Sequence, residues 1–118
     1  MKIQQVKDFC GGLAGVSVRS YGAPQNILVY AVEDKQFAYF KTSEPERWRF
    51  SFRTSPDRFL ELTDIPGIKP ARYMGRFHWV TVVDPATLTA AYLTELIEWS
   101  HSKALASLSK ARRDTLLV

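Results

Sequence analysis

Residues 47–53 alternate strictly between hydrophilic and aromatic side chains, and this pattern constrains the fold more than any other stretch. The segment reads Arg-Trp-Arg-Phe-Ser-Phe-Arg. Successive side chains of a β-strand point to opposite faces, so Trp48, Phe50 and Phe52 share one face. Three aromatic side chains of about 150–250 Å² each contribute about 10–20 kcal/mol of gross hydrophobic free energy. We therefore expect a strand whose aromatic face covers a core and whose arginines face water or anions.

The chain before this strand predicts one helix and a β-hairpin. Apolar residues recur every three or four positions near the N-terminus, which predicts an amphipathic helix over about residues 2–14. Residues 17–25 are expected to form a loop, because they contain the turn sequence Tyr-Gly-Ala-Pro. The β-rich runs 27–32 and 36–41 flank a short charged turn and predict a hairpin, followed by the aromatic strand.

The chain after this strand predicts two helices and one further strand. Ser-Pro-Asp at 55–57 is typical of a helix start, with a serine cap and a proline in the first turn. Residues 68–76 are expected to form a loop, and the apolar residues 77–83 a central strand. Asp-Pro at 84–85 again combines an N-cap residue with a proline in the first turn. The longest helix is expected to begin there and to end near residue 109.

The order of these elements favours an α+β fold. Helices near both termini are expected to cover one side of a single antiparallel sheet, with a short helix between strands. The 118 residues suit a single domain over 1–118 that needs neither disulfides nor a structural metal. Cys10 is the only cysteine, and no apolar run is long enough for a membrane span or a signal segment. We therefore expect a cytoplasmic protein that does not contact membranes.

The charge of the chain is concentrated in its middle. The net charge is +4 and the isoelectric point is near 9.4. Residues 41–76 contain eight basic and five acidic side chains, so this segment carries 8 − 5 = +3 of the net charge. Alternate residues of a strand stand ~6.8 Å apart and DNA advances ~3.4 Å per nucleotide, so a basic strand can meet successive phosphates. The candidates for nucleic-acid contact are Arg47, Arg49, Arg53, Lys69, Arg72 and Arg76.

Aromatic residues beside these charges have two interpretations. Tyr73, His78 and Trp79 are candidates for ligand binding or for stacking on bases. Alternation of arginine with aromatic residues is also typical of a half-solvated strand, in which Trp79 belongs to the core. The exposure of each ring decides between the two.

Catalytic and metal-binding motifs do not occur in the sequence. His78 and His101 are the only histidines, and no nucleophile elbow, cysteine pair, HExxH motif or glycine-rich phosphate loop accompanies them. The acids are scattered singly, and Cys10 lies on the apolar stripe of the first helix with nothing to activate it. We expect no enzymatic activity, no cofactor and no metal site.

Four segments of the chain form a recognisable set. They read Ser-Pro-Asp-Arg-Phe-Leu-Glu-Leu at 55–62, Pro-Gly-Ile-Lys-Pro at 66–70, His-Trp-Val-Thr-Val at 78–82 and Glu-Leu-Ile-Glu-Trp-Ser-His at 95–101. Together with Tyr73 they resemble the MmcQ/YjbR family over about residues 3–113, with His101 where a tyrosine is usual. That family is similar in fold to the bacterial frataxin homologue CyaY, which implies an antiparallel sheet covered by two helices.

The resemblance implies a function in DNA binding, because a double-wing arrangement of sheet hairpins has been proposed to bind DNA in this family. The leading expectation is a non-enzymatic protein that contacts mainly DNA phosphates through its basic strand and the 69–76 loop. One alternative is a protein-interaction or adaptor module that binds an acidic partner, and another is a binder of a small anionic ligand beside Tyr73 and His78. Frataxin-like iron handling is disfavoured, because the first helix has a single acid, Asp8. We expect a monomer or a weak dimer.

Overall fold

The strands of the chain form one antiparallel sheet. The structure, a computed structural model, describes residues 1–44 and 49–117. Within these ranges it contains α1 (Ile3–Gly11), β1 (Val16–Tyr21), β2 (Ile27–Val32), β3 (Lys35–Lys41), β4 (Phe50–Arg53), α2 (Pro56–Thr63), β5 (Ile68–Pro70), η1 (Gly75–Phe77), β6 (Trp79–Val82), η2 (Pro85–Thr87), α3 (Ala90–Ala106) and α4 (Lys110–Leu117), where η marks a 3-10 helix. The strand order is β1-β2-β3-β4-β6-β5, and every neighbouring pair is antiparallel. This confirms the α+β fold with a single antiparallel sheet.

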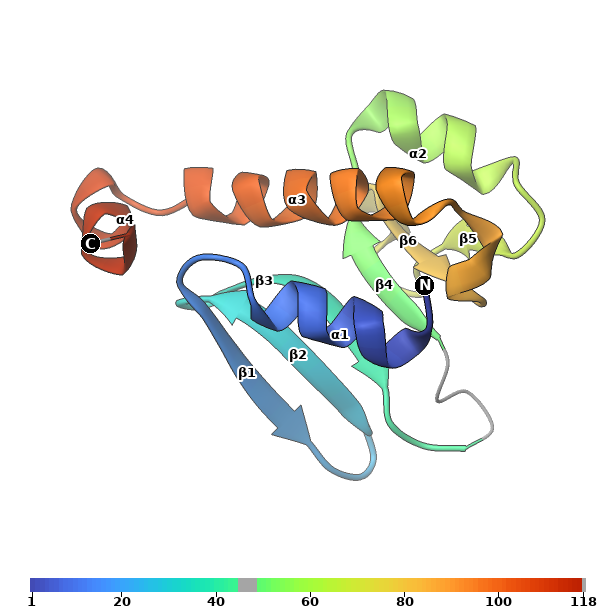
Figure 1. Cartoon of the computed structure of the whole chain (residues 1–118), viewed down its shortest axis with the longest axis horizontal. Helices are drawn as coiled ribbons and strands as arrows, with labels where there is room; N and C mark the ends of the chain where they lie inside the picture. The colour runs from blue at the N-terminus through green and yellow to red at the C-terminus, as the bar shows by residue number, and fades with distance from the viewer. Residues whose placement is uncertain (45–48, 118) are drawn as a thin grey trace.

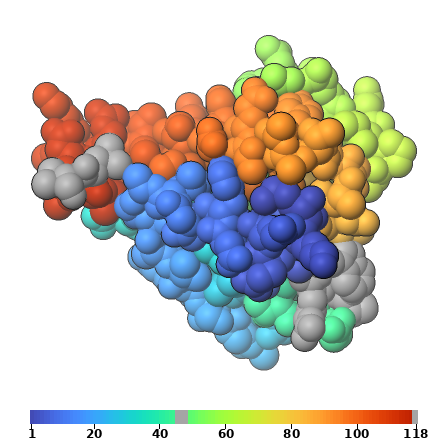
Figure 2. All heavy atoms as spheres, viewed as in Figure 1, coloured from blue at the N-terminus to red at the C-terminus, as the bar shows by residue number. Residues whose placement is uncertain are grey.

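Helices α1 and α3 cover one side of this sheet (Figure 1). The side chains of these two helices touch on this face of the molecule, with atoms of the strands visible below them (Figure 2). Beneath them Phe40, Phe50 and Phe52 are buried and stack in a row, with ring centroids 5.4 and 5.9 Å apart. The aromatic face of the 47–53 segment therefore faces the core as predicted for Phe50 and Phe52, whereas Trp48 lies outside the described residues.

A buried serine of α3 joins two strands that separate. β3 and β4 pair over residues 38–40 and 50–52, and the chain of β3 then carries an extra residue, Phe37, opposite β2. The hydroxyl of Ser100 donates to the carbonyl of Phe37 at 2.7 Å and accepts from the amide of Arg53 at 3.1 Å. Ser100 thus satisfies backbone groups that a continuous strand ladder would otherwise have paired.

Two segments that were expected to be loops contain strands at the edges of the sheet. Residues 16–21 form β1, which pairs along its whole length with β2. The side chains of β1 are mostly exposed, so its serines and arginine are compatible with an edge position although they hide the strand pattern. Residues 68–70 form the short strand β5, and Pro70 is tolerated there because an edge strand needs only half of its hydrogen bonds. The loop prediction was wrong for residues 17–21 and 68–70, whereas residues 22–25 and 71–74 do form turns without helix or strand.

The helix predicted from residue 84 to residue 109 is wrong at both ends. Asp84 caps the short helix η2 by accepting a hydrogen bond from the amide of Ala86 at 2.9 Å. Leu88 then takes an extended conformation and is buried, so α3 begins only after Thr89, whose hydroxyl accepts from the amide of Tyr92. At the other end α3 stops at residue 106, and residues 110–117 form the separate helix α4.

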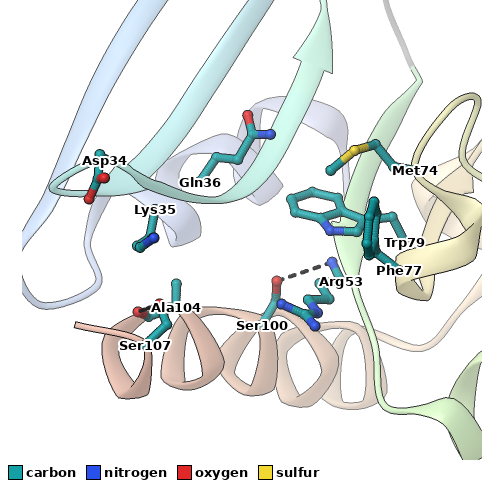
Figure 3. Close-up of a pocket in the computed structure, with 10 residues that line it drawn as sticks. All are labelled: Asp34, Lys35, Gln36, Arg53, Met74, Phe77, Trp79, Ser100, Ala104 and Ser107. Atoms are coloured by element: carbon teal, nitrogen blue, oxygen red, sulfur yellow. Dashed lines mark hydrogen bonds between the residues drawn. The ribbon is translucent and has the colours of Figure 1, made fainter. Parts of the chain in front are cut away.

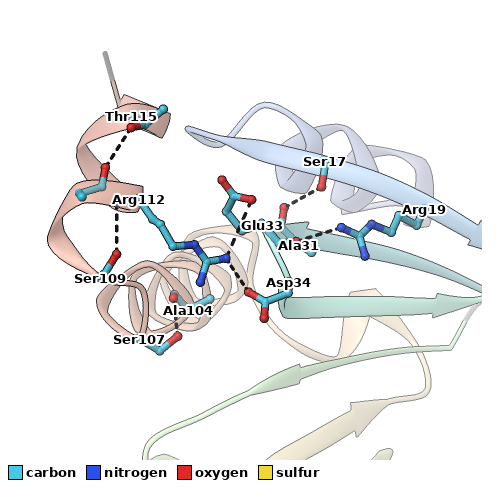
Figure 4. A network of polar contacts seen from close by, with 11 residues as sticks. Ser17, Arg19, Ala31, Glu33, Asp34, Ala104, Ser107, Ser109, Arg112 and Thr115 are labelled. Atoms are coloured by element: carbon cyan, nitrogen blue, oxygen red, sulfur yellow. Dashed lines mark hydrogen bonds and ion pairs between the residues drawn. The ribbon is translucent and has the colours of Figure 1, made fainter.

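Helix α4 is tied to the turn between β2 and β3 (Figure 4). The guanidinium of Arg112 lies 2.8 Å from the carboxylate of Asp34 and 3.9 Å from that of Glu33. The hydrogen bond from Arg112 is the main reason that the pKa of Asp34 lies below its usual range. Arg112 therefore joins α4 to the acids of the hairpin.

Candidate functional site

The sheet face opposite α1 and α3 carries a row of side chains that crosses all six strands. The register of the strands places Lys69, Thr81, Ser51, Tyr39, Val29 and Arg19 side by side in this row. In its centre the buried hydroxyls of Ser51 and Thr81 lie 2.7 Å apart and form a hydrogen bond. Arg19 and Lys69 lie at the two ends of the row. With neighbouring strands ~4.8 Å apart, the two ends are separated by about 24 Å.

Charge is distributed unevenly between the strands and the rest of the molecule. No acidic residue occurs in any of the six strands that the structure describes, whereas these strands contain Arg19, Lys35, Lys41, Arg53 and Lys69. Acids of the helices are partly matched by local cations, as where Arg58 contacts Glu61 at 3.1 Å and Glu95 at 3.8 Å. Of the strand cations, Arg19, Lys41 and Lys69 lie on the sheet face opposite the helices, which is therefore electropositive.

The predicted arginines of the 47–53 segment do not stay together. Arg47 lies outside the described residues. Arg49 is half-buried and lies opposite Lys41, whose amide donates to the carbonyl of Arg49 at 3.0 Å. Arg53 lies at the far end of β4, where the strand leaves β3 and approaches Ser100 (Figure 3). Arg49 and Arg53 thus line different cavities, although their positions on the strand have the same parity.

The predicted cations of β5 and of the segment after it are exposed. Lys69 lies on the edge strand, and Arg72 follows it in the loop with its guanidinium carbon 5.2 Å from the ring centre of Tyr73. Arg76, in η1, lies over the ring of Phe77 at 4.8 Å. We call Lys41, Arg49, Lys69 and Arg72 the basic face, because they surround the same part of the sheet. Arg76 flanks it.

The three aromatic candidates differ in exposure. Tyr73 is 83% exposed and has a positive φ of 67°, which is uncommon for a bulky residue. Trp79 is only 3% exposed and its ring stacks on Tyr39, with centroids 5.6 Å apart. His78 is half-buried at φ 66°, with its ring edge against Phe59 at 5.5 Å. Tyr73 alone of the three presents most of its ring to a ligand.

A cavity of about 310 Å³ opens on the basic face. Its floor comes from neighbouring strands and includes Tyr39, Ser51 and Thr81. Its rim includes Lys41, Arg49, Arg72 and Tyr73. Lys41 belongs to the basic segment 41–76 of the sequence, but no pattern in the sequence groups it with the other residues of this rim. The parity of Tyr39 and Lys41 on their strand was the available signal, but the grouping also requires the register between strands.

A smaller cavity of about 220 Å³ lies where β3 and β4 separate (Figure 3). Arg53, Phe77 and Trp79 line it from one side, and Ser100 of α3 from another. Asp34 and Lys35 also contribute, so its charge is mixed. This cavity offers a less selective environment for an anion than the one on the basic face.

The cysteine and the second histidine belong to the core. Cys10 is fully buried, and burial raises the pKa of its thiol to about 12. A nitrogen of the His101 ring lies 2.8 Å from the carbonyl oxygen of Ala14, and the ring edge meets Phe37 at 5.2 Å. Across residues 1–44 and 49–117, no group of His, Cys, Asp or Glu side chains is arranged to hold a metal ion. No described helix combines the length and the apolar character required to span a bilayer.

Comparisons with known proteins concern the family and the fold. The family model described as YjbR matches residues 12–103. The crystal structure of Deinococcus radiodurans protein DR2400, with domain DUF419, is similar at a TM-score of 0.82 and 24% identity, over 98% of this chain and 87% of that chain. The crystal structure of a protein from Pseudomonas syringae is similar at a TM-score of 0.68 and 24% identity, over 88% of this chain and 99% of that chain. The search among curated proteins found no match.

Proposed function

The chain belongs to the YjbR family, and we propose that it binds DNA through its basic face without catalysing a reaction. The observation that carries this proposal is the absence of acids from the described strands, together with the exposure of Lys69 and Arg72 on the same face. A surface with one sign of charge attracts the phosphate backbone over a distance of about a Debye length.

The contacts are expected to be mainly with phosphates. The row from Arg19 to Lys69 extends about 24 Å, which corresponds to about seven nucleotide steps along one DNA strand. Trp79 is buried and His78 is half-buried, so neither ring offers a large surface for reading bases. Phosphate contacts fix the position of a protein on DNA but carry no sequence information directly.

The absence of catalysis is part of the proposal. The thiol of Cys10 has a pKa of about 12, so it stays protonated at neutral pH and is a poor nucleophile. His101 contacts the backbone of Ala14 inside the fold, away from the basic face. Both observations support a function that does not use Cys10 or His101 as catalytic groups.

The direct test is fluorescence anisotropy of a labelled DNA duplex, titrated with protein at three salt concentrations. The logarithm of the binding constant should fall linearly with the logarithm of the salt concentration, by about 0.9 for each phosphate contact. The double variant Lys69→Glu/Arg72→Glu should bind more weakly. The magnitude of its slope should be smaller by about 1.8, because two phosphate contacts are removed.

A matched control separates the face from the net charge. Lys103→Glu/Lys110→Glu changes the charge by the same amount at exposed positions of α3 and α4. This control should keep the slope of the original protein. Equal loss of affinity and slope in both double variants would refute the basic face as the DNA surface. Absence of duplex binding near physiological salt would refute DNA as the partner and favour an acidic protein.

A further inference from the structure

We propose that the cavity of about 310 Å³ on the basic face binds a single nucleotide unit, an aromatic base that carries a phosphate group. The unit is either a free mononucleotide or an unpaired nucleotide within a strand. This inference goes beyond the proposed function, because contact with paired DNA requires only the surface cations. The volume lies at the lower end of the ~300–1,000 Å³ typical of small-molecule sites, which suits one such unit.

The floor of the cavity is a rigid polar platform. Ser51 and Thr81 lie on adjacent strands in the middle of the sheet, and both are buried. Their mutual hydrogen bond of 2.7 Å uses one of the two hydroxyl hydrogens. Among the described residues no other acceptor is bonded to the second hydrogen, so it remains for a ligand. A hydroxyl pair with one donor and several acceptor sites matches the edge of a base, which carries both kinds of group.

The aromatic rim suits the flat face of a base. Tyr73 lines the cavity and exposes 83% of its surface, although its φ of 67° is a conformation that glycine or asparagine adopts more readily. The turn that holds it is fixed by a hydrogen bond from the amide of Met74 to the carbonyl of Ala71 at 3.2 Å. A bulky ring kept in an unfavourable backbone region and left largely uncovered points to a role in binding. Stacking on an aromatic ring accepts any base.

Cations at the rim suit the phosphate. The ammonium group of Lys41 donates to the carbonyl of Gln25 at 3.2 Å, which holds it beside the cavity and leaves two of its three hydrogens for an anion. The guanidinium of Arg72 lies over Tyr73 and can form a bidentate contact with phosphate oxygens. None of the described residues that line the cavity is acidic. An anionic ligand is therefore favoured over a neutral or cationic one.

The test compares adenosine 5′-monophosphate with its parts. Titration of the protein with the nucleotide, followed by amide chemical shifts in NMR, should move the signals of Ser51, Thr81 and residues 71–74. We expect a dissociation constant of about 1 mM or tighter, and binding of adenosine or inorganic phosphate that is about tenfold weaker. Equal affinity for phosphate and nucleotide would refute recognition of a base, and unchanged shifts in the cavity would refute the site.

Variants of exposed aromatic residues supply the control. Tyr73→Asn removes the ring and suits the positive φ, so the fold should be retained while nucleotide affinity falls about tenfold. Trp99→Gln removes an exposed ring from α3, outside the cavity, and should leave affinity unchanged. Loss of affinity in both variants, or in neither, would refute the assignment of Tyr73.

The source of the nucleotide is distinguished with two short duplexes, one fully paired and one with a single unpaired adenine. Tighter binding of the second duplex, lost in Tyr73→Asn, identifies an unpaired nucleotide in a strand as the ligand. Equal binding of both duplexes, with the free nucleotide still bound, identifies the free mononucleotide. Nucleotide binding without any duplex binding would overturn the proposed DNA contact alone, and paired-duplex binding without nucleotide binding would overturn the cavity alone.

Discussion

Replacement of Ser100 with alanine tests whether one hydroxyl holds the separated strands β3 and β4 to α3. The side chain is buried, and its oxygen bonds both the carbonyl of Phe37 at 2.7 Å and the amide of Arg53 at 3.1 Å. Alanine has no group that can replace either bond. The variant therefore leaves a backbone acceptor on β3 and a backbone donor on β4 without their partner.

The expected loss in the free energy of unfolding is about 2 kcal/mol. An unpaired buried polar group costs about 1–3 kcal/mol, so two cost about 2–6 kcal/mol. Ser100 and Arg53 border the cavity of about 220 Å³, through which water can reach the amide of Arg53, so the lower end of that range applies. Alanine also favours a helix over serine by about 0.5 kcal/mol, which offsets part of the loss. With a urea m-value of ~1–3 kcal/mol/M, the midpoint should fall by about 1 M.

Urea unfolding followed by circular dichroism measures this loss. Ser102→Ala, at an exposed position of the same helix, reports the gain in helix propensity alone and is the matched control. The amide hydrogen of Arg53 should also exchange faster in Ser100→Ala than in the control. A difference between the two variants below about 0.5 kcal/mol, the usual range of surface substitutions, would refute the bridging role of Ser100.

Two further predictions concern a backbone position and the buried thiol. Gly15→Ala should lower the free energy of unfolding by about 1–2 kcal/mol, because Gly15 has φ 73° and an added Cβ would lie 3.2 Å from Leu116. Gly22→Ala, where an added Cβ meets nothing within 4 Å, is the control, and equal unfolding midpoints would contradict the prediction. Burial raises the pKa of Cys10 from 9.0 to about 12, so the stability contributed by its neutral thiol is complete below about pH 9 and is lost as the pH rises toward 12. The unfolding free energy of Cys10→Ala, measured by urea titration, should therefore fall less between pH 9 and pH 11 than that of the original protein. Equal falls in the two proteins would contradict burial of the thiol as the cause.

Local signals predicted the central part of the fold. The alternation around Phe50 and Phe52, the hairpin of β2 and β3 and the serine cap of α2 each lie within a few residues, and the structure contains all three. The edge strand β1 escaped prediction although it forms a local hairpin with β2, because its exposed serines and arginine interrupt the apolar pattern of a strand. The start of α3 was misplaced, because burial of Leu88 interrupts a helix that the capping signal alone would begin earlier. The likeness to the frataxin homologue and the single domain over 1–118 stay predictions.

The candidate site was predictable in charge but not in geometry. Counting charges along the chain found the basic middle segment, and the exposed positions of Lys69 and Arg72 agree with that count. The cavity combines residues from the strands β2, β3, β4 and β6 and from the segments between strands, and their grouping depends on a register that periodicity does not specify. Sequence alone could not separate exposed Tyr73 from buried Trp79, because both are aromatic residues beside basic ones.

The cations at the two ends of the strand row also affect how copies of the protein meet one another. An edge strand offers unpaired backbone groups to a neighbouring chain, and charged residues and proline at that edge hinder such pairing. Arg19 is exposed on the long edge strand β1, while Lys69 and Pro70 occupy the short edge strand β5. Neutralising Lys69 would therefore weaken a barrier against edge-to-edge aggregation as well as any contact with phosphate. Reversing its charge keeps that barrier, so Lys69→Glu isolates the loss of anion binding where Lys69→Ala would mix it with self-association.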